Sequence, residues 1–204
     1  MTRKLFTLSG AVALIGGLTL AVASFSPGNA APSAPPAPGA NLGSAVSALN
    51  RGAAAADTLP AELMALPVAA RFESAATPRA RKVGESLGRT YWVVPGQRGE
   101  VCLVAASGSG ETFESAGTCT DRSQLARGGI WFSETTASGD QQVSLLVPDS
   151  VTSVRSARGS ASVSGNFAVV DVPSTGGAAA LTVTDVSGAA YGLDLGNLTS
   201  PAGS

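Results

Sequence analysis

Hydrophobic and polar residues follow three different patterns along this chain. Residues 5–23 form one long apolar run, residues 44–72 favour short helical pieces, and the chain from about residue 84 consists of β-branched and aromatic runs between turn residues. Short apolar runs bounded by Gly, Pro, Asn, Asp or Ser predict strands. We therefore expect a leader at 1–30, a Pro/Ala-rich linker at 31–43, short helices and a basic linker at 44–83, an all-β domain at 84–197 and a flexible tail at 198–204.

The strand predictions begin with a hairpin. Arg89–Val94 is rich in β-branched and aromatic residues, stops at Pro95-Gly96 and is followed by a similar run at Glu100–Ala105. Eight or nine such strands with regular turn signals predict a mainly β fold, a small antiparallel sandwich or barrel. The later strand candidates are Gly129–Ser133, Gln142–Val147, Val151–Arg155, Ser160–Ser164, Asn166–Val172, Ala180–Thr184 and Ala190–Leu195.

The region before the β domain favours short helices. Ser44 is a candidate N-cap for a helix that runs through Ala56. A second helix is expected to start at Asp57-Thr58-Leu59-Pro60, and Pro67 would end or kink it. Helices this short are not stable alone, so they either pack on the β domain or remain mobile. The expected buried face of the first helix consists of Val46, Leu49 and Ala53, and residues 74–82 are expected to be a linker or a frayed helix.

The N-terminal run has the order of a secretory signal. Arg3 and Lys4 precede the apolar residues Leu5–Ala23, and the small residue Ala30 precedes Ala31 at the expected cleavage site. The run is also about long enough to span a membrane as an uncleaved anchor. In both cases residues 31–204 are exported. The protein would contact a membrane only through the leader, and only if the leader is not cleaved. The predicted location is secreted or in the cell envelope.

Two cysteines, Cys102 and Cys119, are the only ones in the chain. In an exported protein an even pair predicts a disulfide bond. The bond would close the loop 103–118, which contains several glycines and is expected to be a flexible hairpin tip held at its base. A metal site or a reactive thiol pair lacks partner residues in the sequence.

Charge and composition narrow the function. Without Arg3 and Lys4 the chain carries 11 basic and 14 acidic residues, and it has no histidine. The sequence lacks the clustered excess of basic residues that would indicate nucleic-acid binding. The missing histidine excludes hydrolases that use a histidine as their general base. The local basic group Arg71, Arg79, Arg81, Lys82 and Arg89 is either a solvated surface or a contact with an anionic envelope polymer or the acidic domain.

Few side chains suggest chemistry. Val147–Val151 contains Pro148-Asp149, which favours a turn, although Asp149 with Glu134 is also a candidate carboxylate pair for a hydrolase. Acidic residues near the disulfide fit no calcium-loop spacing and are expected to be solvated. The aromatic residues are expected to be core, with a sugar-stacking platform as the alternative. These acidic residues are Glu111, Glu114 and Asp121, and the aromatic ones are Trp92, Trp131 and Phe132.

The region from about residue 55 to 195 resembles a group of uncharacterised exported proteins of high-GC Gram-positive bacteria. The resemblance rests on Tyr91–Gly96, Val101–Leu103 with Cys119, Gly128-Gly129, Leu146–Asp149 with Val151 and Val154, Asn166-Phe167, and Asp57–Pro60 upstream. Ser150 departs from the group's pattern, in which Gly follows Pro-Asp. The resemblance implies export and implies no activity, cofactor or catalytic residue.

We therefore expect a non-enzymatic module that binds a protein or envelope-polymer partner, with no cofactor and no metal. The expected contact surface is the loop between the cysteines, with Glu111, Phe113 and Glu114 as its contact residues. Two alternatives stay open at this point. They are a carboxylate-dependent hydrolase and an exported protease inhibitor that presents the disulfide-bonded loop.

Overall fold

A computed structural model describes residues 45–74, 76–173 and 180–195. The leader, the cleavage site at Ala30 and Ala31, the Pro/Ala-rich linker, the Ser44 cap and the tail all lie outside the described residues. Within these ranges, no helix has the length and apolar character needed to cross a membrane.

The fold is mainly β, as the sequence predicts. The described residues form eleven strands and six short 3₁₀ helices, with one α-helix of seven residues. The strands are β1 Arg81–Ser86, β2 Arg89–Pro95, β3 Val101–Ser107, β4 Glu114–Thr120, β5 Ile130–Thr135, β6 Gln141–Leu146, β7 Val151–Arg155, β8 Ser160–Ser162, β9 Phe167–Val172, β10 Ala180–Asp185 and β11 Ala190–Asp194. The helices are η1 Ser47–Asn50, η2 Ala55–Asp57, η3 Ala61–Ala65, η4 Pro67–Arg71, η5 Gln97–Gly99, η6 Gly110–Thr112 and α2 Arg122–Gly128.

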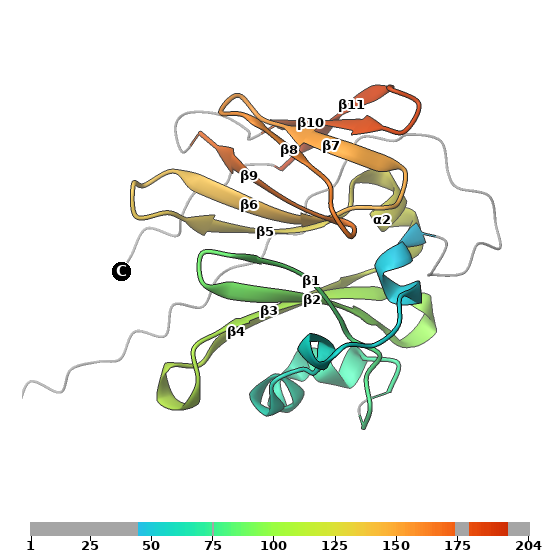
Figure 1. Ribbon diagram of the computed structural model, residues 1–204, viewed down its shortest axis with the longest axis vertical. Helices are drawn as coiled ribbons and strands as arrows, with labels where there is room; N and C mark the ends of the chain where they lie inside the picture. The colour runs from blue at the N-terminus through green and yellow to red at the C-terminus, as the bar shows by residue number, and fades with distance from the viewer. Residues whose placement is uncertain (1–44, 75, 174–179, 196–204) are drawn as a thin grey trace, which may run out of the picture.

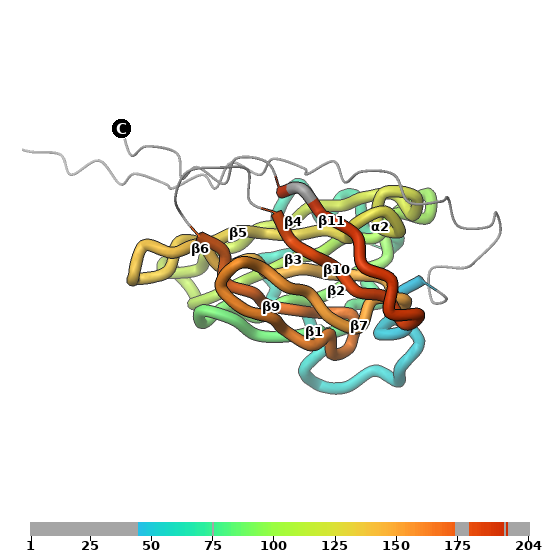
Figure 2. Tube along the Cα trace, turned by 90° about the horizontal axis from the view of Figure 1, so that it is seen from above, coloured from blue at the N-terminus to red at the C-terminus, as the bar shows by residue number. Residues whose placement is uncertain are grey.

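Three antiparallel sheets are stacked on one another (Figure 1). The first sheet has the order β1-β2-β3-β4, the middle sheet β5-β6-β9 and the outer sheet β11-β10-β7-β8. Seen from above, β7, β10 and β11 lie across the other two sheets (Figure 2). The fold is therefore sandwich-like, with one more sheet than a two-layer sandwich.

The stacking explains why the strands of the middle sheet carry apolar residues on both faces. Successive side chains of a strand point to opposite faces, and both faces of the middle sheet are covered. In β6, Val143 and Leu145 pack toward the outer sheet, whereas Leu146 joins a second core cluster with Tyr91 and Phe167 between the middle and first sheets. Strands that are buried on both sides cannot show the polar alternation of a half-exposed strand.

The N-terminal helices pack on the β domain. Helices η3 and η4 cover the outer face of the first sheet in a third core cluster, in which Leu63 and Phe72 are fully buried (Figure 1), whereas Ala48 of η1 joins the second cluster. The indole nitrogen of Trp92 donates a hydrogen bond to the Ala56 carbonyl at 3.1 Å. Trp92 and Phe132 are therefore core residues, and Trp131 is partly buried against the outer core.

The predicted helix through Ala56 is interrupted. Only η1 and η2 are helical, and residues 51–54 between them are not. Val46 is buried and Leu49 is partly buried, as expected, but Ala53 is exposed. The physical reason lies in long-range contacts, because Arg51 and Ala54 both bind the carboxylate of Asp57, which is itself attached to β1. A continuous helix would break this arrangement.

Two strands, β1 and β4, extend into regions where the sequence predicts a linker and a flexible tip. Strand β1 begins in the predicted basic linker, and β3 and β4 together occupy most of the predicted flexible tip 103–118, which shrinks to residues 108–113. Strands β1 and β4 are polar because they lie at the edges of the first sheet. In β4, Gly117 lies against Val68 of η4, a contact that leaves no space for a side chain.

Helix α2 connects the first sheet to the middle sheet. Its N-cap Asp121 accepts a hydrogen bond from the Gln124 amide, and Gly129 ends it with φ +86°. A Cβ at Gly129 would lie 2.3 Å from the Leu146 carbonyl oxygen, so glycine is required on both grounds.

Candidate functional site: the hairpin end

Four β-hairpins turn at the same end of the stacked sheets, on the left in Figure 1. The turns join β1 to β2, β3 to β4, β5 to β6 and β7 to β8. We call these four turns, residues 87–88, 108–113, 136–140 and 156–159, the hairpin end. Turns that are held by a rigid sandwich are common sites of binding.

The predicted contact loop belongs to the hairpin end. Glu111 is exposed at its tip, and Phe113 is partly buried against the core beneath the N-terminal helices. Glu114 begins β4, and its carboxylate accepts a hydrogen bond from Arg89 at 2.7 Å. Glu111 and Glu114 therefore face solvent, whereas Phe113 also contributes to packing.

The disulfide lies at the other end of the same hairpin. Cys102 and Cys119 are directly opposite each other in the β3–β4 ladder, and their sulfurs are bonded. Cys102 is fully buried, so the bond belongs to the core under the N-terminal helices. It connects two regular strands and does not clamp a flexible loop.

Arg89 connects three strands at the hairpin end. Its guanidinium forms ion pairs with Glu114 of β4 and with Glu134 of β5 at 2.5 Å. Burial raises the pKa of the Glu134 carboxyl, while the positive charge of Arg89 lowers it in part. The Tyr91 hydroxyl is buried beside Ser144 and Glu134 without a hydrogen bond of normal geometry in the described structure, and burial raises its pKa.

Further polar contacts hold the other turns in place. The Ser86 hydroxyl donates to the side-chain oxygen of Gln142, whose amide donates to Asp171 at 2.9 Å. Arg158 of the β7–β8 turn pairs with Asp140 of the β5–β6 turn at 2.9 Å. The turns are thus linked to one another across sheet boundaries.

Leu87 is the residue of the hairpin end that sequence reasoning missed. It is the first residue of the two-residue turn between β1 and β2, its φ is +49°, and it is 49% exposed. A left-handed conformation costs a non-glycine residue roughly 1–2 kcal/mol. The signal was present in the sequence, because Leu87-Gly88 stands where such a turn ordinarily has Asn-Gly or Asp-Gly.

The two candidate catalytic carboxylates are not brought together. Glu134 pairs in register with Gln142 near the hairpin end, whereas Asp149 follows the opposite end of β6. The Asp149 Oδ1 atom accepts hydrogen bonds from the Ser47 amide at 2.8 Å and from Asn166 at 2.7 Å. Asp149 therefore attaches the N-terminal segment to the turn, and Ser150 does not adopt the positive φ for which glycine would be needed.

The acidic residues near the disulfide also separate. Glu111 and Glu114 lie at the hairpin end, whereas Asp121 follows the far end of β4 and caps α2. In the described ranges, no three His, Cys, Asp or Glu side chains are grouped as metal ligands would be.

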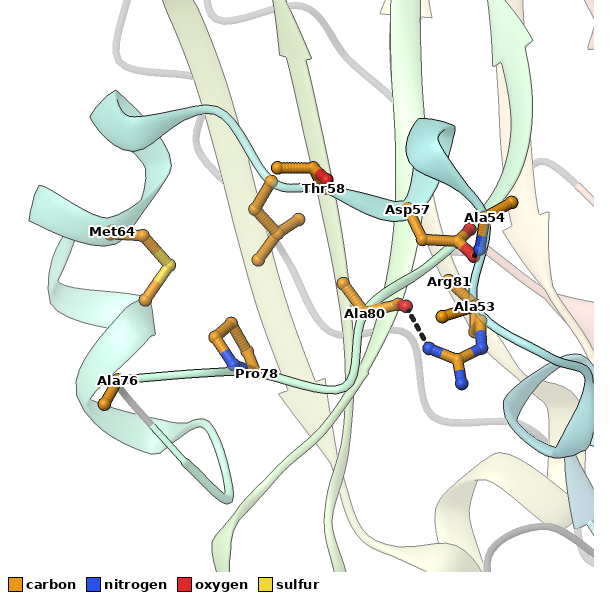
Figure 3. A pocket seen from close by; sticks show the side chains of 10 residues that line it. Ala53, Ala54, Asp57, Thr58, Met64, Ala76, Pro78, Ala80 and Arg81 are labelled. Carbon is orange, nitrogen blue, oxygen red and sulfur yellow. Dashed lines mark hydrogen bonds between the residues drawn. The ribbon is translucent and has the colours of Figure 1, made fainter.

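A groove of about 350 Å³ opens beside Asp57, between η2, η3 and the segment before β1 (Figure 3). The Asp57 carboxylate is buried, and it accepts hydrogen bonds from Arg51 and from the amides of Ala54 and Lys82. Burial alone would raise the pKa of Asp57, but these hydrogen bonds and the charge of Arg51 lower it to about 2. The carboxylate is therefore ionised and already paired.

Comparisons with family models, curated proteins and solved structures found no match. Homology therefore assigns no function to the fold or to the hairpin end.

Proposed function

We propose that this protein is an exported, non-enzymatic module that binds a protein partner through its hairpin end. The observation that carries the proposal is Leu87, a large apolar side chain that is exposed in an unfavourable backbone conformation. Neither property helps the protein to fold. Strained residues that persist in a structure are frequently found at binding sites.

The surroundings of Leu87 favour a defined contact surface. The ion pairs Arg89–Glu114 and Arg89–Glu134 connect strands at the hairpin end, and Asp140–Arg158 connects two of its turns. A surface that is ordered before binding loses less conformational entropy when a partner associates. An apolar anchor inside a polar rim is the usual composition of a protein interface.

The proposed location outside the cytoplasm rests on two features. The chain begins with the pattern of a secretory signal, and Cys102 is bonded to Cys119. Disulfide bonds persist in oxidising compartments. A secreted protein and a protein of the cell envelope both agree with these features.

Photo-crosslinking in the organism that makes the protein tests the proposed surface. A photoreactive amino acid is placed at position 87, at position 111 or, as the matched control, at position 186. Val186 is the other large apolar residue that is strongly exposed among the described residues, and it lies in the β10–β11 turn, outside the hairpin end. We expect one protein adduct at positions 87 and 111 and none at 186.

Substitutions provide the second part of the test. Leu87→Asn should abolish the adduct formed from position 111, and Val186→Asn should leave it unchanged. Equal adducts from all three positions, or adducts to a wall polymer alone, would contradict a protein-binding hairpin end.

A further inference from the structure

We propose that the groove beside Asp57 binds a small amphiphilic carboxylate, a short apolar chain that ends in an acid group. The inference is independent of the hairpin end, since the groove lies between the N-terminal helices and β1 (Figure 3). The walls of the groove, its charge and its size all fit such a ligand.

The walls of the groove are apolar on the side away from Asp57. Leu59, Met64, Pro78 and Ala80 contribute to its lining, and Met64 and Pro78 stand together on that side in Figure 3. These side chains present no group that requires a polar ligand. They fit a hydrocarbon chain, whose burial is favourable by the hydrophobic effect.

The other side of the groove carries an uncompensated positive charge. Arg81 lines it and forms no ion pair with any described acidic residue. The Arg81 Nε atom donates to the Arg51 carbonyl at 3.0 Å, and Nη1 donates to the Ala80 carbonyl at 2.7 Å. These neutral acceptors hold the guanidinium in place and leave Nη2 free of protein partners in the described structure.

Asp57 does not neutralise Arg81. Both carboxylate oxygens of Asp57 accept hydrogen bonds from Arg51. The charges of Asp57 and Arg51 therefore cancel, and the positive charge of Arg81 remains. A positioned guanidinium beside an apolar wall is suited to a carboxylate, with which arginine forms strong, directional hydrogen bonds.

The size of the groove sets the length of the ligand. At roughly 30 Å³ for each water-sized group, about 350 Å³ holds on the order of a dozen non-hydrogen atoms. Carboxylates of eight to ten carbons are of this size, and octanoate is the natural probe. The groove is at the lower end of the range for small-molecule sites.

Titration calorimetry of the exported protein with octanoate, 1-octanol and acetate tests the proposal. We expect saturable binding of octanoate with one site, at least tenfold weaker binding of octanol and no binding of acetate. Arg81→Gln should weaken octanoate binding at least tenfold, and the matched control Arg98→Gln should change it less than twofold. Arg98 is an exposed arginine in the β2–β3 turn.

A second variant separates loss of the ligand site from loss of folding. Ala53 is exposed and lines the groove, so Ala53→Phe should fill the groove while Arg81 keeps its place. This variant should keep the wild-type circular dichroism spectrum and lose octanoate binding. Equal affinity for octanoate and octanol, no saturable octanoate binding by the wild type, or unchanged binding in both variants would overturn the proposal.

Discussion

The side chain of Asn166 donates a hydrogen bond to the carboxylate of Asp149 at 2.7 Å and another to the Val147 carbonyl at 3.1 Å. Its own oxygen accepts a hydrogen bond from the Ala48 amide at 3.0 Å. One buried amide thus joins the end of β6, the turn before β7 and the N-terminal segment. Asn166 also has φ +68°, a conformation that asparagine tolerates better than most residues.

Two substitutions at Asn166 should separate its hydrogen bonds from its backbone conformation. Asn166→Gly keeps the positive φ and removes the side-chain bonds, so it should destabilise the fold by about 2 kcal/mol. Asn166→Ala should cost roughly 1 kcal/mol more because of its φ. Urea denaturation measures both, and an equal stability of the two variants would contradict the backbone contribution.

Removal of the disulfide should weaken the protein and loosen the N-terminal helices. The bond spans 17 positions, so Cys102→Ala with Cys119→Ala should cost about 3 kcal/mol in the chain-entropy model. Hydrogen exchange should increase most around Leu63 and Phe72, which share a core cluster with both cysteines. Thiol titration of the denatured, unreduced wild type should find no free thiol, and finding two would refute the bond.

Asp57 should make stability depend on acid pH. Its pKa in the fold is about 2, below the ordinary 3.8, so its contribution is fully present above about pH 4 and is lost as pH falls toward 2. Asp57→Asn should remove this part of the pH dependence and cost about 2 kcal/mol near pH 7. Urea midpoints of both proteins from pH 2 to pH 7 measure the difference, and parallel curves would show that Asp57 is not responsible.

A methyl group at Gly84 should collide with the core. A Cβ there would lie 2.2 Å from Cδ1 of Phe167, whose ring centroid lies 4.9 Å from that of Tyr91. Gly84→Ala should therefore destabilise the fold by about 1–3 kcal/mol. Gly192→Ala is the matched control, because nothing lies within 4 Å of its Cβ position. A thermal melt should show a lower midpoint only for the first variant.

Leu87→Asn should raise stability while it removes the proposed contact. Asparagine accepts the left-handed conformation more readily, so a gain of about 1 kcal/mol is expected. Chemical denaturation measures this change without any partner. A loss of stability would mean that Leu87 supports the fold, and it would remove the main argument for a binding role.

Much of the fold could be predicted from local patterns. The hairpin formed by β2 and β3 was predicted because Tyr91–Val94 is β-branched and aromatic and stops at a Pro-Gly turn. Strand β4 could not be predicted, because Glu114–Thr120 has few apolar residues and is held by its ladder with β3. The sequence draws attention to one turn of the hairpin end, through Glu111, Phe113 and Glu114, because nothing local shows that four turns share one end.

The sequence by itself determined the mainly β class, most strand positions, the pairing of Cys102 with Cys119 and the expectation of export. These properties depend on periodicity, turn residues and residue counts, which are local or additive along the chain. Only the tertiary structure decided that three sheets stack, that Asp149 and Glu134 lie apart and that Leu87 is exposed at the same end of the sheets as the contact loop. Those relationships depend on contacts between residues far apart in sequence, and local patterns do not encode them.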